Sequence, residues 1–386
     1  MPGLLSPAPP IRATPGRLYH PGMRAAVLYQ PGEPLRVEDV ELGAPRAGEV
    51  RVRVAAAGVC HSDYHYMRGD LVGNLPAVLG HEGAGVVEEV GPGVTSVRPG
   101  DHVVLLWRTS CGRCEFCSTG RPALCPDGAA VRASGRMPDG TSRLSRDGVE
   151  IKHFLGVSCF AEQTVCQERS VLKLPEDVPL PVGAVAGCAV MTGVGAVVNT
   201  ARVEPGSTVL VVGAGGVGLC AVMGAGLAGA ARIVAADLNA GRLELATSFG
   251  ATDVVDASHE DVVKAVRELT GGGVDYAFEV IGLPATVAQA VGALRTGGTA
   301  VAIGIAPAGA AAQVDLGELV RQEKTLKGSI YGSTRPQADF PRLFELYRRG
   351  RLPLDRLVTR QWPLHQINEA YEALIAGTEA RSVLVP

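Results

Sequence analysis

The pattern of apolar and polar residues changes near the middle of the chain. From residue 24 to about 175, short apolar or alternating runs are broken by Gly and Pro, which is typical of strands. Strands are predicted at 24–29, 50–54, 85–90 and 102–106. From about residue 190, apolar runs at 208–212, 232–236, 275–279 and 299–304 alternate with helical patterns such as 242–249. The sequence therefore predicts a β-rich part followed by an α/β part with a doubly wound parallel sheet.

Both ends of the chain show different patterns. Residues 340–349 and 364–375 have the periodicity of amphipathic helices, and a last strand at 381–385 is expected to return to the β-rich part. Residues 1–22 contain six prolines and no apolar segment behind basic residues, so they do not have the pattern of a secretory signal. We expect a flexible, Pro-rich tail there.

Two long uncharged stretches, 178–201 and 207–231, are long enough to suggest membrane spans. Both consist mainly of Gly, Ala and Val, and neither has basic flanks or an aromatic belt. A buried strand that runs into a tightly packed helix explains this composition better. We therefore expect no membrane association.

Composition and charge narrow the functional classes. The 386 residues exceed the usual size of one hydrophobic core, so two domains are expected. The formal net charge is -3 and Lys and Arg are spread along the chain, which argues against nucleic-acid binding and favours small ligands. Nine cysteines without an export signal suggest a reducing cytoplasm, where clustered cysteines more often bind metal than form disulfides.

Four of the cysteines have the spacing of a metal site. Cys111, Cys114, Cys117 and Cys125 form C-x2-C-x2-C-x7-C, and four thiolates supply a closed tetrahedral set for zinc. The alternative is an iron-sulfur cluster, but that motif has three residues before its last cysteine, whereas seven stand here. A closed zinc site has no open position, so this metal is expected to stabilise the loop.

A glycine-rich turn predicts a dinucleotide site. Residues 213–218 read G-A-G-G-V-G between an apolar strand and a helix, which is the context that makes this motif specific. The expected contacts are Gly213, Gly215, Gly216, Val217 and Gly218, with the pyrophosphate at the helix N-terminus. Asp237 lies 19 residues after Gly218, where a carboxylate binds the ribose hydroxyls and favours NAD over NADP. Arg242 argues against this preference for NAD, because a nearby cation can accommodate the 2′-phosphate of NADP.

Further motifs add a family resemblance that extends from Arg24 to the C-terminus. They are residues 60–65 (CHSDYH), 80–85 (GHEGAG), 137–143 (MPDGTSR), 187–188 (GC) and 278–282 (FEVIG), together with the cysteine loop and the glycine turn. This set resembles the medium-chain zinc-dependent alcohol dehydrogenases of the class I and class III type. The resemblance implies a Rossmann NAD-binding domain at 190–333 and a GroES-like catalytic domain at 23–189 and 334–386 with both zinc sites.

The resemblance also assigns roles to residues. It implies that Cys60, His81 and Cys188 bind a catalytic zinc with an open fourth position, so that each subunit holds two zinc ions. Ser62 and His65 occupy the positions of a proton relay. Asp63 occupies the position of the group that orients His81, and Glu82 lies behind the metal. Three further residues are carried over: Trp107 for the substrate pocket, and His61 and Arg381 for the cofactor pyrophosphate.

The expected reaction is reversible hydride transfer between a primary alcohol and NAD, which gives an aldehyde and NADH. One alternative is a dehydrogenase of formaldehyde adducts of glutathione or mycothiol. Glutathione-dependent relatives carry an arginine shortly after the last structural cysteine, whereas Ala129 stands here. A second alternative is a non-catalytic relative that keeps the fold. The resemblance further implies a homodimer, with a tetramer as the alternative, formed through an edge strand expected at 299–305.

Overall fold

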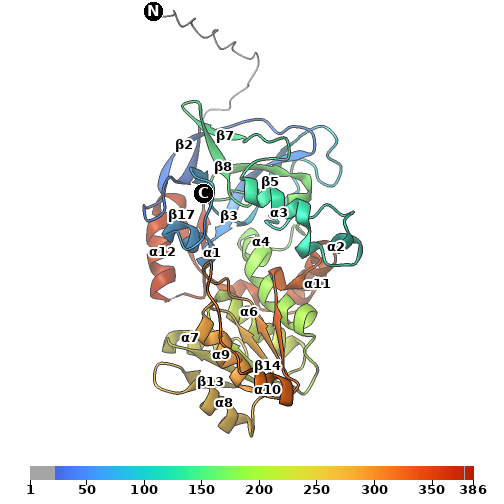
Figure 1. Cartoon of the computed structure of the whole chain (residues 1–386). Coiled ribbons are helices and arrows are strands. Elements are labelled where there is room, and N and C mark those ends of the chain that lie inside the picture. Colours follow the sequence, from blue (N-terminus) through green and yellow to red (C-terminus); the bar gives the residue numbers. More distant parts are fainter. Residues whose placement is uncertain (1–21, 378) are drawn as a thin grey trace, which may run out of the picture.

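The computed structural model describes residues 22–377 and 379–386 and has two lobes (Figure 1). A β-rich lobe contains both described ends of the chain, and the other lobe is built on a parallel sheet. The tail predicted at 1–22 lies outside the described residues, apart from Gly22.

The β-rich lobe contains a closed barrel and a seven-stranded sheet. The barrel strands, in order, are β1 (Met23–Leu28), β2 (Arg36–Leu42), β7 (Leu144–Arg146), β8 (Val149–His153) and β4 (Ala77–Val78). The sheet runs β10 (Val171–Lys173), β6 (His102–Leu105), β5 (Glu82–Val90), β3 (Glu49–Gly58), β18 (Arg381–Val385) and β17 (Val358–Pro363), with β9 (Gln163–Gln167) paired to β3. Because β18 pairs antiparallel with β3, the predicted return of the last strand is confirmed.

The second lobe is a six-stranded parallel sheet, as the alternating pattern predicts. Its order is β13 (Asp253–Asp256), β12 (Arg232–Asp237), β11 (Thr208–Val212), β14 (Val274–Glu279), β15 (Leu294–Ala302) and β16 (Thr325–Gly328). The connecting helices are α6 (Gly216–Leu227), α7 (Ala240–Ser248), α8 (Val262–Thr270), α9 (Pro284–Gly292) and α10 (Leu316–Arg321). The strand order reverses beside β11, and ligands of such sheets bind at this point, beyond the carboxyl ends of the strands.

The predicted edge strand at 299–305 is wrong. β15 lies inside the sheet between β14 and β16, and β16 forms the edge. The sequence signal for β16 is weak because its four residues, TLKG, are mostly exposed and do not form an apolar run.

The uncharged stretch at 178–201 forms one long helix in the core. Leu180–Ala201 is long and apolar enough to cross a membrane, but 83% of its most apolar window is buried inside the protein. It consists of α4 (Leu180–Val185), a π-helical segment at Ala186–Val190, α5 (Met191–Gly195) and a second π-helical segment at Ala196–Ala201. Small residues let it pack closely: a Cβ at Gly193 would lie 2.5 Å from Cβ of Cys220 in α6. The helix is therefore a core helix between the two lobes.

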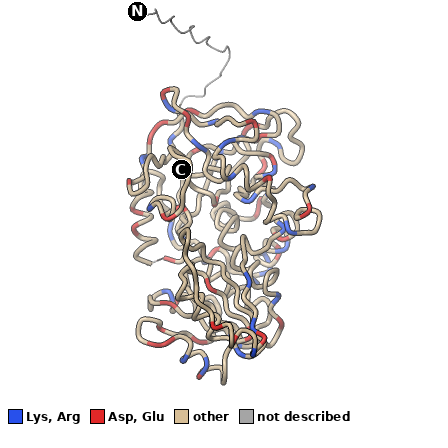
Figure 2. Tube along the Cα trace, in the orientation of Figure 1, with Lys and Arg blue, Asp and Glu red and all other residues tan. Residues whose placement is uncertain are grey.

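The other helices cover the β-rich lobe and the junction with the parallel sheet (Figure 1). They are α1 (His61–Arg68), α2 (Glu115–Ser118), α3 (Pro126–Ser134), α11 (Pro336–Arg348) and α12 (Ile367–Ala376), with short 3-10 turns at Pro122–Leu124, Glu168–Ser170, Tyr331–Ser333, Leu354–Leu357 and Leu364–Gln366. Figure 2 shows basic and acidic residues interspersed over both lobes, in line with the spread of charge along the sequence.

Candidate active site and cofactor turn

Four buried side chains with metal-binding atoms meet between the two lobes. One donor atom each of Cys60, His81, Glu82 and Cys188 lies within 4.8 Å of all the others. Cys60 follows β3 and precedes α1, His81 directly precedes β5, and Glu82 is its first residue. Cys188 lies in the first π-helical segment of the core helix. Two thiols and an imidazole at this spacing fit a zinc ion, and the structure brings together the three predicted ligands from distant segments.

His81 is oriented by Asp63 from α1. Oδ1 of Asp63 lies 3.1 Å from Nδ1 of His81 and also accepts a hydrogen bond from the backbone N–H of Gly80. Because Asp63 occupies Nδ1, the other ring nitrogen is left for a metal. Burial alone would lower the pKa of His81, but Asp63 and Cys60 raise it well above its usual value.

The two buried thiols differ in acidity. A hydrogen bond from the Cys188 thiol, together with the nearby His81, lowers the pKa of Cys60 well below its usual value. The same hydrogen bond and complete burial raise the pKa of Cys188. A thiolate is the form that binds metal, so the Cys60 environment favours the ligand form of the side chain.

Glu82 extends the predicted ligand set. Its Oε2 pairs with Arg381, whereas Oε1 is buried and has no hydrogen-bond partner among the described residues. Burial raises the pKa of Glu82 to about 7 despite the charge of Arg381. A metal ion beside Oε1 would supply the missing partner, so this orphaned oxygen supports the fit of a cation.

Arg381 links the metal group to the glycine turn. Its side chain lies against Gly216, where a Cβ would overlap Cδ of Arg381. The sequence predicts a pyrophosphate contact for Arg381, but in this structure its guanidinium pairs with Glu82 and the residue is buried. Close packing against Arg381 thus favours a glycine at position 216.

The predicted relay residues lie together on α1. Ser62 and His65 are one turn apart on this helix, and both are partly exposed. Nδ1 of His65 lies 3.0 Å from Oδ2 of Asp70, a residue that the sequence analysis did not single out. The glycine at 69, which ends α1, is the sequence signal that could have indicated this fold-back.

Aromatic rings pack on the His81 side of the metal group. Trp107 stands edge-on to His81 with ring centroids 5.8 Å apart, and Phe154 does so at 6.1 Å. Tyr331 packs against Trp107 at 5.1 Å and donates a hydrogen bond to the backbone oxygen of Gly187. Trp107 was expected here from the resemblance, whereas Phe154 and Tyr331 carried no sequence signal.

The four-cysteine loop forms a second group. Donor sulfurs of Cys111, Cys114, Cys117 and Cys125 lie within 4.8 Å of one another. The Sγ atoms lie 3.4 Å apart for Cys114 and Cys117 and 4.0 Å apart for Cys111 and Cys117. Ligands in a tetrahedral zinc site with Zn–S bonds of about 2.3 Å are separated by about 3.8 Å, so this group fits zinc. Backbone N–H groups of Cys111 and Cys114 donate to Sγ of Cys125 and Cys111.

The glycine turn connects β11 to α6. Gly213 has a left-handed φ of 98°, and a Cβ at Gly218 would overlap its carbonyl oxygen. Gly215 is the N-cap of α6, so the free N–H groups of the helix begin here, next to Gly216 and Val217. These features fit the close approach of a pyrophosphate.

Asp237 ends β12 beside this turn. Its Oδ2 accepts a hydrogen bond from Ala214 N, and its Oδ1 accepts one from Asn239 N. Nη1 of Arg242 lies 4.0 Å from Oδ2 of Asp237, so the cation is partly offset by the carboxylate. His61 is the first residue of α1 and is exposed.

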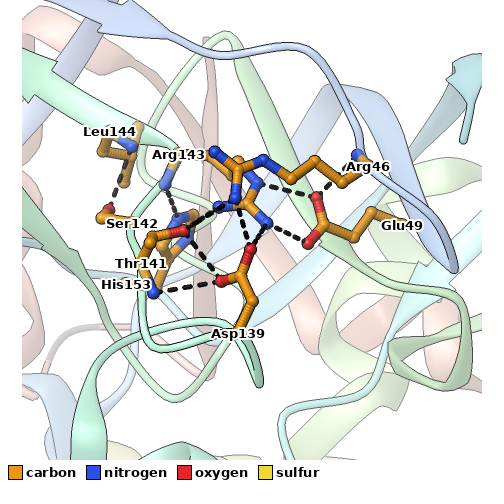
Figure 3. A network of polar contacts seen from close by, with 8 residues as sticks. All are labelled: Arg46, Glu49, Asp139, Thr141, Ser142, Arg143, Leu144 and His153. Carbon is orange, nitrogen blue, oxygen red and sulfur yellow. Dashed lines mark hydrogen bonds and ion pairs between the residues drawn. The ribbon is translucent and has the colours of Figure 1, made fainter. Parts of the chain in front are cut away.

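The motif at 137–143 lies away from the metal group and forms a polar network (Figure 3). Buried Arg143 donates to both oxygens of Glu49 and to Asp139, and Arg46 also donates to Asp139. His153 accepts the backbone N–H of Arg143. This network fastens a barrel loop, so the motif has a structural role in this chain.

Comparison with known proteins gives the family. Residues 46–176 match the alcohol dehydrogenase GroES-like domain, and residues 216–349 match the zinc-binding dehydrogenase domain. A class-3 alcohol dehydrogenase of Drosophila melanogaster is 43% identical over 367 residues, covering 94% of this chain and 97% of that protein.

Two solved structures are similar over nearly the whole chain. An alcohol dehydrogenase zinc-binding domain protein from Burkholderia ambifaria has a TM-score of 0.90 and 41% identity, covering 95% of this chain and 99% of that one. Benzyl alcohol dehydrogenase from Acinetobacter calcoaceticus has a TM-score of 0.89 and 37% identity, covering 94% and 99%. With both domains matched and relatives at this identity, the chain belongs to the medium-chain family of zinc-dependent, NAD-linked alcohol dehydrogenases.

Proposed function

We propose that the chain catalyses reversible hydride transfer between a primary alcohol and NAD at the group formed by Cys60, His81 and Cys188. The observation that carries this proposal is the meeting of these three buried ligands near the glycine turn. When bound there, zinc acts as a Lewis acid that draws the pKa of an alcohol hydroxyl toward neutrality. The second zinc is assigned to the four-cysteine loop, where all four positions are filled by thiols.

The chain's own residues orient the site and move the proton. Asp63 holds the His81 ring, and the rings of Trp107 and Phe154 pack against it and give this side of the metal group an apolar wall. Ser62 takes part in removing the hydroxyl proton, and His65, which is partly exposed, releases it to water.

NAD is proposed as the preferred cofactor because Asp237 lies at the end of β12, where a 2′-phosphate would meet its charge. Arg242 opposes this preference, but its guanidinium is already near the same carboxylate. The ratio of kcat/KM for NAD and NADP tests the proposal, and Asp237→Ala is expected to shift that ratio toward NADP.

A second candidate substrate is a hydroxymethyl thiol adduct that carries a carboxylate. It is favoured by Arg132, which lies one turn beyond Ala129 on α3 and whose buried Nη1 has no hydrogen-bond partner among the described residues. Burial and the charge of Arg108 lower the pKa of Arg132 to about 10. Arg108 itself stacks over Trp107, with its guanidinium 5.5 Å from the ring centroid. Among the described residues neither of these neighbouring cations has an acidic partner, so a substrate anion would stabilise both.

The deciding experiment is NADH formation by the purified protein. Substrates are ethanol, longer primary alcohols, benzyl alcohol, and formaldehyde with glutathione or mycothiol. Turnover of plain alcohols that is lost in Cys188→Ala supports the main proposal. Turnover only with an added thiol, and its loss in Arg132→Ala, supports the adduct instead, and no turnover at all favours a non-catalytic role.

The proposal has three further parts. The NAD-binding domain spans residues 190–333, the protein is located in the cytoplasm, and it forms a homodimer. The proposed dimer contact is the edge strand β16, whose Leu326 is exposed, together with the exposed Leu316 and Val320 of the neighbouring α10. Edge strands with apolar surface are prone to pair with a second copy. Sedimentation of the wild-type protein and of Val320→Glu tests this contact.

A further inference from the structure

The end of α1 places a carboxylate on the predicted relay histidine. Gly69 adopts a left-handed φ of 83° after the helix, and the chain folds back over its last turn. The backbone N–H of Asp70 then donates to the carbonyl of His65 at 2.9 Å, and Leu71 N–H donates to the same oxygen. This turn brings Oδ2 of Asp70 to 3.0 Å from Nδ1 of His65.

The contact determines which ring nitrogen carries hydrogen. An ionised carboxylate has acceptors and no donor, so a hydrogen bond with it requires the hydrogen on Nδ1. The other nitrogen, Nε2, then has a free lone pair and can accept a proton. Without a partner, a neutral imidazole exchanges between both tautomers, and only one of them leaves Nε2 free.

The surroundings suit a group that exchanges protons with water. The side chains of His65 and Asp70 are 25% and 23% exposed, so the pair lies at the boundary between interior and solvent. Nε of Arg68 is 3.6 Å from Oδ2 of Asp70, which keeps a positive charge beside the carboxylate. His61, one turn earlier on α1, is a further titratable group whose charge interacts with that of His65.

We propose that Asp70 is a positioning residue of the proton relay, which fixes Nδ1–H of His65 and leaves Nε2 to receive the proton. The inference rests on the proposed alcohol dehydrogenase activity. With NAD bound as the hydride acceptor, the alcohol would lose a hydride from its carbon and a proton from its hydroxyl group, and Nε2 of His65 would receive that proton by way of Ser62. The imidazolium, with Nδ1–H still bonded to Asp70, then releases one proton to water, and reduction runs the same path in reverse.

The chain offers a matched control for this pair. Nδ1 of His259 lies 3.0 Å from Oδ2 of Asp256 in the other lobe, with the same pair of atoms at the same distance. Asp70→Ala is expected to slow single-turnover NADH formation about tenfold, with the KM values for alcohol and NAD unchanged. Asp256→Ala is expected to leave the rate unchanged. Asp70→Glu should recover part of the lost rate, since it restores an acceptor.

A spectroscopic measurement tests the tautomer directly. The ¹⁵N resonances of the His65 ring are expected to report Nδ1–H in the wild-type protein and a mixture of both tautomers in Asp70→Ala. The backbone hydrogen bonds of the turn do not involve the Asp70 side chain, and circular dichroism checks that the variant is folded.

The outcomes separate this inference from the proposed function. If His65→Gln is slow and Asp70→Ala reacts at the wild-type rate, Asp70 does not position the relay. If both variants react at the wild-type rate, the relay itself is wrong. Resonances that show Nε2–H on His65 of the wild-type protein overturn the inference whatever the kinetics, even if no alcohol is oxidised.

Discussion

The two metal-binding groups of this chain are built in opposite ways. The four-cysteine loop takes all its ligands from residues 111–125, and three of its four cysteines are partly exposed. The group of Cys60, His81 and Cys188 is fully buried and draws its ligands from three distant segments. Sulfur atoms of the loop accept hydrogen bonds from backbone N–H groups, whereas His81 is held by the carboxylate of Asp63.

This difference indicates a division of labour. A loop with local ligands, supported by backbone N–H groups, is suited to a structural role: the bound metal stabilises the loop itself. A group assembled from the β-rich lobe and the core helix forms only when the whole protein has folded, and its supporting side chains can adjust the chemistry. Loss of a ligand should therefore affect activity at the buried group and stability at the loop.

The largest expected effect is that of Cys188→Ala. Removing one of the two thiols from the buried group should lower the rate of NADH formation by a factor of about a thousand or more, because activation of the alcohol hydroxyl is lost. Zinc content should fall from two ions to one per subunit. Cys166→Ala is the control, since Cys166 is also buried but lies in β9 outside both groups. Full activity with a single remaining zinc would contradict the proposed site.

A smaller loss of activity is expected for Asp63→Asn. The amide oxygen can still accept from Nδ1 of His81, but the negative charge that supports the ligand is gone. We expect activity and affinity for the buried zinc to fall about ten- to a hundredfold. Asp101→Asn, which removes a carboxylate that pairs with Lys173, should leave both unchanged. Zinc titration with a chelating dye, combined with initial rates, measures the two quantities.

The two groups also differ in how far the sequence predicts them. For the loop, the spacing of Cys111, Cys114, Cys117 and Cys125 is enough to predict a metal site, because all four ligands are close together in the sequence. Cys60, His81 and Cys188 have no spacing rule, and only the family resemblance links them. Their supports depend on tertiary packing: the orphaned oxygen of Glu82 and the contact of Asp70 with His65 have no counterpart in the apolar pattern.

The fold shows the same limit. The apolar pattern predicts the strands at the centre of the parallel sheet, since they are buried on both faces and form continuous apolar runs. It misses β16, because an edge strand of four mostly exposed residues needs no such run. The sequence consequently places the edge of the sheet on β15, one strand too far inside.

At the loop, Cys114→Ala is expected to lower stability and leave the chemistry intact. Losing one thiolate opens the closed site, so the melting temperature should fall by about 5 °C or more, with one zinc lost. The activity of the remaining folded protein should stay within about twofold of wild type, because no loop sulfur belongs to the buried group. A loss of activity as large as that of Cys188→Ala, without a change in melting temperature, would remove the distinction between the groups.

The smallest effect is expected in the metal-free network of Figure 3, which fastens a loop of the same lobe with charges. Burial raises the pKa of Asp139, but hydrogen bonds from Arg143 and Thr141 prevail and hold it well below the usual value. A depressed pKa means that the stabilisation is complete above the unfolded pKa of about 4 and is lost as the pH falls below it. Asp139→Asn should therefore lower the melting temperature by about 2 °C at pH 7, and the difference should narrow below about pH 4.

Calorimetry of the wild-type protein, Asp139→Asn and Asp147→Asn between pH 7 and pH 3.5 measures this effect. Asp147 is the control because its side chain is 91% exposed. A chelator should lower the melting temperature of wild type and Asp139→Asn equally, since the network holds its loop through side-chain charges while the cysteine loop depends on a metal. If the melting-temperature difference between the wild-type protein and Asp139→Asn stayed constant with pH, the charge of the carboxylate would not contribute to stability. The network would then depend on local geometry, as the cysteine loop does.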